Sequence, residues 1–168
     1  MPFDQMLGNP NNPENIAPAT LRRVIRSALA TQVLGGANDG RSLAATRRYI
    51  DSLDLSDKHL RHLVVLADST VRGYQWPIDQ DRSDNSLARW LGCTKGQAKA
   101  AAWLACRAAL SLIVDRPATT GNEKLHRLRV LLEYPGALYR GQQRKAIAVA
   151  RRDVAAIITG RAFADNSA

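Results

Sequence analysis

The chain has 168 residues, of which 45% are hydrophobic, so it is long enough to bury a core and has the composition of a soluble globular protein. No apolar run approaches the roughly 18–20 residues of a membrane span, and the N-terminal sequence MPFDQMLGNPNNPEN is not typical of a secretory signal. The two cysteines, Cys93 and Cys106, form no C-x-x-C pair, which predicts small core residues in a cytoplasmic protein.

The net charge of +9 comes entirely from the second half of the chain. Residues 1–84 carry 10 Lys and Arg against 10 Asp and Glu, whereas residues 85–168 carry 14 against 5. Arginine outnumbers lysine by 19 to 5, and the guanidinium group binds phosphate through two parallel hydrogen bonds. This asymmetry predicts a polyanionic partner, nucleic acid first of all. The alternative is an arginine-rich composition whose charges only solvate helix faces.

The first residues predict an arm rather than a packed element. Residues 1–16 contain many prolines and asparagines without periodicity, which indicates a flexible arm. We expect residues 17–168 to form a single, mostly α-helical domain. Its first helix is predicted over 17–34, with Arg22, Arg23 and Arg26 off the apolar face, before the breaker GGANDG.

Two further helices are predicted before the middle of the chain. The first spans 42–53, and the second follows the N-cap residue Ser56 and closes at Gly73. The segment 74–84 is predicted to be a loop held by Trp76-Pro77.

A helix-turn-helix is predicted at about residues 84–107, whose core reads NSLARWLGCTKGQAKAAAWLACR. Gly92 follows a short apolar helix at the point where a positive φ is needed, and Thr94 is a natural N-cap for a second helix. Ala98 and Ala101 are small enough to let the two helices cross closely. The alternative is that these two helices are core packing in a helical bundle.

The segment 110–132 is ambiguous. LSLIVDR, PATTGN and EKLHRLRVLL fit a strand, a turn and a strand that would form a small β-hairpin wing, but the leucine spacing fits a helix at least as well. A last helix is predicted from about 142 to 159 and ends at Gly160. Its inward face is expected to hold Ala146, Ile147, Ala150, Val154, Ile157 and Ile158.

Taken together, His59 to Leu132 resembles the winged helix-turn-helix domains of prokaryotic regulators and of plasmid or phage replication proteins. LRHLVVLAD resembles their first helix, DNSLARWLGCTKGQAKAAAWL the helix-turn-helix, and LSLIVDRPATTGNEKLHRLRV the closing hairpin. The resemblance covers under half of the chain and implies that the second helix enters a groove of duplex DNA. The alanine-rich second helix departs from the pattern, because few of its side chains can hydrogen-bond base edges.

Two sets of residues are candidates for nucleic-acid binding. In the first set, Thr94 caps the second helix, Lys95, Gln97 and Lys99 would face the groove, and Arg89, Arg107 and Arg116 would hold phosphates. The second set is a C-terminal stripe that could follow a phosphate backbone or only aid solubility. It consists of Arg144, Arg151 and Arg152, with Arg127 and Arg129 just before it.

Other chemistry is weakly represented in the sequence. Trp90 and Trp103 suit the core better than stacking on bases. His59 and His62 lack the further ligands of a zinc site, and the aspartates of 79–84 lack the pattern of a calcium loop. We therefore expect neither a metal, a cofactor nor an enzymatic activity.

The expected function is nucleic-acid binding, DNA rather than RNA, in the control of transcription or replication. The N-terminal half would form a homodimer or dock a partner protein. One alternative is a non-catalytic subunit, similar to the small helical subunits of CRISPR effector complexes, that grips the nucleic-acid backbone without reading bases. Another is an interaction module whose basic face binds an acidic protein.

Overall fold

A computed structural model describes residues 12–13, 15–35, 40–73, 86–134 and 140–160. Within these ranges the chain forms seven helices and no strand, which confirms the mostly α-helical prediction. The chain divides into two compact units, Met1–Ala109 (unit 1) and Leu110–Ala168 (unit 2), although the sequence analysis expects one domain. The predicted loop at 74–84, with Trp76 and its aspartates, lies outside the described residues.

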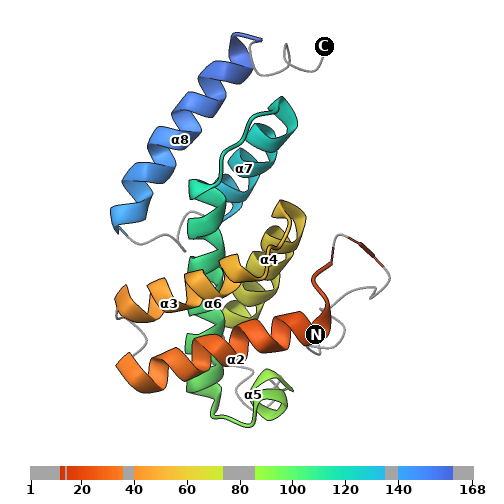
Figure 1. The fold of residues 1–168 in the computed structure, drawn as a ribbon, viewed down its shortest axis with the longest axis vertical. Coiled ribbons are helices and arrows are strands. Elements are labelled where there is room, and N and C mark those ends of the chain that lie inside the picture. Colours follow the sequence, from red (N-terminus) through yellow and green to blue (C-terminus); the bar gives the residue numbers. More distant parts are fainter. Residues whose placement is uncertain (1–11, 14, 36–39, 74–85, 135–139, 161–168) are drawn as a thin grey trace. The chain divides into compact units, whose positions relative to one another are not determined.

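Unit 1 contains four complete helices and the start of a fifth (Figure 1). They are α2 (Pro18–Gly35), α3 (Gly40–Ser52), α4 (Asp57–Gly73), α5 (Ser86–Leu91) and α6 (Lys95–Asp115), and α6 continues into unit 2. These bounds lie within a few residues of the predicted ones, because Pro18 and the glycines mark the ends of the helices clearly.

Helices α2 and α3 pack against each other through apolar side chains and a small polar contact. The Ser42 hydroxyl donates to the Thr31 carbonyl oxygen at 3.1 Å, and the Thr31 and Thr46 hydroxyls lie 3.3 Å apart. Ser56 accepts a hydrogen bond from the His59 amide at 3.2 Å, which confirms it as the N-cap of α4. The largest fully buried side chains of unit 1 are Ile16, Leu21, Val24, Ile25, Ile50, Leu60, Leu63, Val64 and Leu104.

Helix α6 is a core helix over most of its length. Beyond its first turn nearly every residue is buried or half-buried, and the buried Cys106 thiol lies 3.9 Å from the Val64 carbonyl oxygen. Among the described helices, α6 alone is long and apolar enough to cross a membrane, but 72% of that window is buried inside the protein. The core helix of a soluble protein meets the same test, so this is weak evidence for a span.

The C-terminal end of the predicted flexible arm is held against α4. The Ile16 amide donates to His62 Nδ1 at 2.9 Å, and His59 Nε2 lies 2.9 Å from the Pro13 carbonyl oxygen. Ile16 itself is buried. The end of the predicted arm therefore contacts α4 at Pro13 and Ile16, whereas its flexibility stays a prediction.

Unit 2 consists of the end of α6 and two further helices, α7 (Gly121–Glu133) and α8 (Arg140–Ile158). The ambiguous segment 110–132 is helical on both sides of a short connection, so the described residues contain no β-hairpin wing. A capping box begins α7: Thr120 Oγ1 accepts from the Glu123 amide at 3.2 Å, while Glu123 Oε2 accepts from the Thr120 amide at 3.0 Å. The Thr120 and Thr119 amides, which both donate to Glu123 Oε2, lower the pKa of Glu123.

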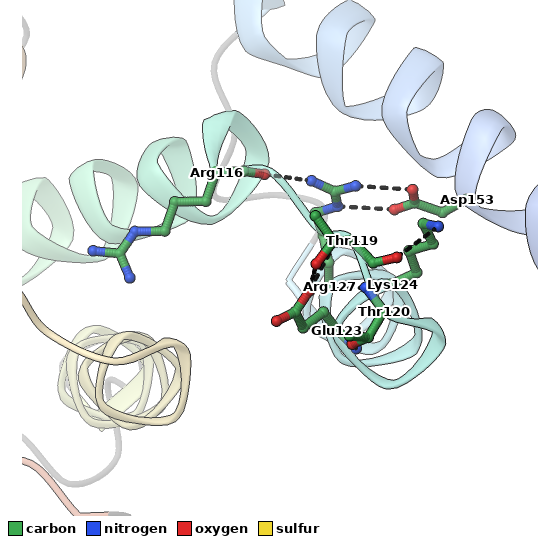
Figure 2. Close-up of polar contacts among 7 residues, drawn as sticks. All are labelled: Arg116, Thr119, Thr120, Glu123, Lys124, Arg127 and Asp153. Atoms are coloured by element: carbon green, nitrogen blue, oxygen red, sulfur yellow. Dashed lines mark hydrogen bonds and ion pairs between the residues drawn. The ribbon is translucent and has the colours of Figure 1, made fainter. Parts of the chain in front are cut away.

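A buried ion pair joins the three helical parts of unit 2 (Figure 2). Arg127 on α7 donates from Nε and Nη2 to the two carboxylate oxygens of Asp153 on α8, each at 2.8 Å. Its Nη1 donates to the carbonyl oxygen of Arg116, at the end of α6, at 2.6 Å. Arg127 is 5% exposed and Asp153 1%, so one guanidinium satisfies a carboxylate and a helix C-terminus away from water.

This ion pair fixes which face of α8 is turned inward. Asp153 shares the buried face with Gln142, Ala146 and Val149. The prediction that Ile147, Val154 and Ile158 face inward is wrong, because these side chains are 53%, 43% and 78% exposed. Apolar periodicity predicted the helix but not its rotation, since a charged residue occupies the centre of the inner face.

The hydrogen bond to His62 predicts a pH-dependent attachment of the segment before α2. Burial, and to a smaller extent the neighbouring His59, lowers the pKa of His62 below its ordinary value of 6.5. Nδ1 can accept from Ile16 only when the ring is neutral, so this stabilisation is complete above the unfolded pKa and is lost as the pH falls through the folded pKa. Amide hydrogen exchange at Ile16 should accelerate, relative to core amides, as the pH is lowered from about 7.5 to about 5.

In His62→Gln the side-chain oxygen can accept at every pH in this range, so the excess acceleration should disappear. An unchanged pH profile in that variant would contradict the assignment.

The buried ion pair predicts a strong asymmetry between single and double substitutions. Asp153→Ala leaves the Arg127 charge buried without its partner and should lower the free energy of unfolding by about 3–5 kcal/mol. The double variant Arg127→Met with Asp153→Leu removes both charges and should lose much less. Urea denaturation of the full chain followed by circular dichroism measures both, and equal losses would contradict this description of the pair.

Candidate nucleic-acid interface

Helices α5 and α6 are joined by a tight turn that is stabilised by two backbone hydrogen bonds and contains a left-handed glycine. The Cys93 amide donates to the Ala88 carbonyl oxygen at 3.0 Å, and the Gly92 amide donates to the Arg89 carbonyl oxygen at 3.2 Å. Gly92 has a φ of +70°. These two bonds around a left-handed glycine form a Schellman motif, which ends α5 and reverses the chain direction as the sequence predicts.

A capping box begins α6 directly after this turn. Thr94 Oγ1 accepts from the Gln97 amide at 3.2 Å, and Gln97 Oε1 accepts from the Thr94 amide at 3.0 Å. Thr94 is therefore the N-cap, as predicted. Gln97 has a role that the sequence analysis missed, although the T-x-x-Q spacing was the signal for it.

The first turn of α6 carries the most exposed of the predicted groove residues. Lys95 is exposed and Lys99 is half-buried. Arg89, which lies on α5 shortly before Gly92, is also exposed. Gln97 is exposed, but its side-chain oxygen is used in the cap. Of the three predicted groove residues, the two lysines are therefore the ones whose side chains take no part in the cap.

The later turns of α6 cannot enter a groove in this fold. Ala98, Ala101 and Ala102 are buried, and the residues on the outer side, including Trp103 and Arg107, are half-buried. The prediction that the whole helix Thr94–Arg107 faces outward is therefore wrong, because only its N-terminal turn is well exposed. Contact through the N-terminal turn is common for helix-turn-helix proteins, whose recognition helices contact base edges with N-terminal residues.

Helix α2 adds basic residues beside α5. The Arg22 guanidinium lies over the Trp90 ring, 4.1 Å from the ring centroid, in a cation–π contact. Trp90 is half-buried, and Arg22 covers a face of its ring, which leaves Trp90 a poorer platform for stacking on bases. Arg23 and Arg26 are exposed on the same helix. The sequence predicts that these arginines lie off the apolar face of α2, and the packing of Arg22 on Trp90 connects α2 with α5.

The predicted basic residues of unit 2 are in different environments. Arg127 is buried and bound to Asp153, so it leaves the candidate interface; its donors hold the fold together. Arg129 is exposed and paired with Glu133 at 2.8 Å, and the half-buried Arg116 offers its carbonyl oxygen to Arg127. The three predicted stripe residues are exposed and form no ion pair with an acid among the described residues. They are Arg144, Arg151 and Arg152 on α8.

The cysteines and histidines of unit 1 form no metal site in the described part of the chain. No group of three His, Cys, Asp or Glu side chains there could hold a metal ion. Burial raises the pKa of the Cys93 thiol, and that of Cys106 to about 12, which disfavours the nucleophilic thiolate at neutral pH. His59 and His62 bind backbone groups instead.

No family model, no curated protein and no solved structure matches this chain.

The turn between α5 and α6 provides a matched pair of glycine substitutions. A Cβ at Gly92 or at Gly96 would meet no neighbour within 4 Å, so an added methyl group would clash with no other residue at either site. They differ because Gly92 has a left-handed backbone, where an L-residue costs about 1–2 kcal/mol. Gly92→Ala should destabilise the protein by that amount, whereas Gly96→Ala should stabilise it by up to about 1 kcal/mol. Thermal unfolding compares them, and losses of the same size would contradict the turn geometry.

Proposed function

We propose that the protein binds duplex DNA with the α5–turn–α6 pair as a helix-turn-helix, in the control of transcription or replication and without catalysis. The observation that carries the proposal is the exposed first turn of α6, held in place by the Schellman motif and the capping box. A rigid turn of this kind fixes the direction of a positively charged helix N-terminus. Lys95, Lys99 and Arg89 lie around it, and the helix dipole adds to their attraction for phosphate.

This proposal assigns most of the binding free energy to phosphates. Gln97 is used in the cap, and α6 is buried beyond its first turn, so few side chains remain for base edges. Neutralised phosphates release counterions, which makes the affinity steeply dependent on salt. We therefore expect a modest ratio of specific to non-specific binding.

The use of Gln97 in the cap and the enclosure of α6 beyond its first turn also favour a second candidate function. A subunit that grips a nucleic-acid backbone without reading bases needs an exposed basic surface but no accessible recognition helix. Arg89, Lys95 and Lys99, together with Arg23 and Arg26 of α2, supply such a surface in unit 1. This candidate predicts binding to single strands without sequence preference, whereas the first predicts preference for a duplex that survives competitor DNA.

Two variants with the same change in net charge test the location of the interface. Lys95→Glu with Lys99→Glu should weaken binding to a labelled duplex by about tenfold or more. The slope of log K against log[salt] should fall by the amount expected for the loss of about two phosphate contacts. Arg144→Glu with Arg151→Glu changes the net charge equally but lies on α8, so it should have a much smaller effect. Fluorescence anisotropy with duplex DNA, single-stranded DNA and single-stranded RNA over a salt series measures both variants.

Intact binding in the lysine variant would contradict the proposed contact. A larger loss in the arginine variant would transfer the phosphate site to α8. Thermal melting of both variants checks that each retains the fold.

A further inference from the structure

Helix α8 exposes an apolar stripe that nucleic-acid binding does not explain. Ile147, Val154 and Ile158, hereafter the outer stripe, are spaced by seven and four residues and therefore lie on one face of the helix. All three side chains are more than two fifths exposed. Burial of such a side chain against an apolar surface is favourable, and a phosphate backbone provides no apolar surface to bury it.

The outer stripe is not a misplaced core face. The inner face of α8 is already occupied, with Ala146, Val149 and Asp153 buried and Asp153 bound to Arg127 of α7. Turning the outer stripe inward would break that ion pair and leave a buried charge without its partner. Within unit 2, the inner face therefore has no place for these side chains as long as the ion pair is formed.

Two arginines run beside the outer stripe with the same seven-residue spacing. When Ile147 and Val154 take the a positions of a heptad, Arg144, Arg151 and Ile158 take the e positions, so the two arginines border the apolar side chains ahead of Ile158 at the edge of a helix–helix contact. Both are exposed, and neither forms an ion pair with an acid among the described residues. Charges at e positions select the partner helix, and these two select carboxylates.

A second copy of α8 does not supply those carboxylates. The only acidic residue between Arg140 and Ile158 is Asp153, which is buried with Arg127. Two copies of this face would bring arginine close to arginine with no acid of α8 between them.

We propose that the outer stripe of α8, flanked by Arg144 and Arg151, docks an acidic amphipathic helix of a partner protein. The apolar side chains of that helix cover Ile147, Val154 and Ile158, and its glutamates or aspartates pair with the two arginines. This docking surface is independent of the α5–turn–α6 contact, so either of the two can fail without the other.

The test uses a fluorescent peptide of about three heptads, with leucine at a and d and glutamate at e and g, and a matched peptide with lysine in place of glutamate. The full-length protein should bind the glutamate peptide at least about tenfold more tightly than the lysine peptide. Arg144→Glu with Arg151→Glu should reverse this preference. Lys95→Glu with Lys99→Glu has the same net charge and should leave the preference unchanged.

A second variant tests the apolar part of the surface. Ile147→Gln with Val154→Gln and Ile158→Gln places good helix formers at exposed positions, so the fold should be retained, but affinity for the glutamate peptide should fall by at least about tenfold. Circular dichroism and thermal melting verify the fold of this variant.

The proposal is overturned by any of four results. The peptides bind equally well or not at all, or the glutamine variant keeps its affinity. In the third, the wild-type protein sediments as a dimer and the glutamine variant as a monomer, so the outer stripe binds a second copy of the chain. Lastly, the glutamine variant loses binding to duplex DNA or to phosphatidylserine vesicles and not to the peptide.

Discussion

The buried pair between Arg127 and Asp153 is the constraint on which unit 2 depends. A guanidinium and a carboxylate taken out of water are tolerated only when almost all of their hydrogen-bonding capacity is used. Here Arg127 uses two donors on Asp153 and a third on the last turn of α6. One side chain thereby connects three helical segments and favours the rotation of α8 in which Asp153 faces α7.

The rotation of α8 has a functional consequence, since it decides what the surface of unit 2 offers. The inner face takes one acid and small side chains, and the outer face receives the larger apolar ones with Arg144 and Arg151 beside them. Unit 1 offers a different kind of surface. There a backbone-fixed turn presents the N-terminus of α6 with lysines and an arginine nearby, and little apolar surface accompanies them. The first surface suits a protein helix and the second suits phosphates, so the proposed roles follow from the chemistry of each.

Sequence reasoning predicted the helices well because their ends are chemically marked. Pro18, Ser56, Gly92 and Thr94 each act by a local mechanism that needs no tertiary contact. The predictions were wrong where a polar residue binds a partner that is distant in the sequence. Nothing near Arg127 in the sequence indicates that Asp153 will bind it, 26 residues later, so Arg127 was assigned to phosphate and the apolar face of α8 to the core.

The same limit applies to the candidate interface. The sequence placed Lys95, Gln97 and Lys99 on an outer surface, but how far α6 is enclosed depends on α2, α3 and α4 packing together, which periodicity does not report. The hydrogen bond from the Ile16 amide to His62 is equally non-local, because the two residues are 46 positions apart in the sequence. Local signals thus give the elements and the turn, whereas the choice of exposed face requires the fold.

The rotation of α8 is tested most directly by thiol accessibility in single-cysteine substitutions along the helix. Desolvation raises the pKa of both native thiols, the half-buried Cys93 and the buried Cys106, and labelling of the unsubstituted chain provides the background. At neutral pH a maleimide should modify Ile147→Cys and Val154→Cys rapidly, and Ala146→Cys and Val149→Cys slowly. Fast labelling at 146 and 149 with protection at 147 and 154 would show that α8 is turned the other way, and the Arg127–Asp153 pair could not then be the constraint described here.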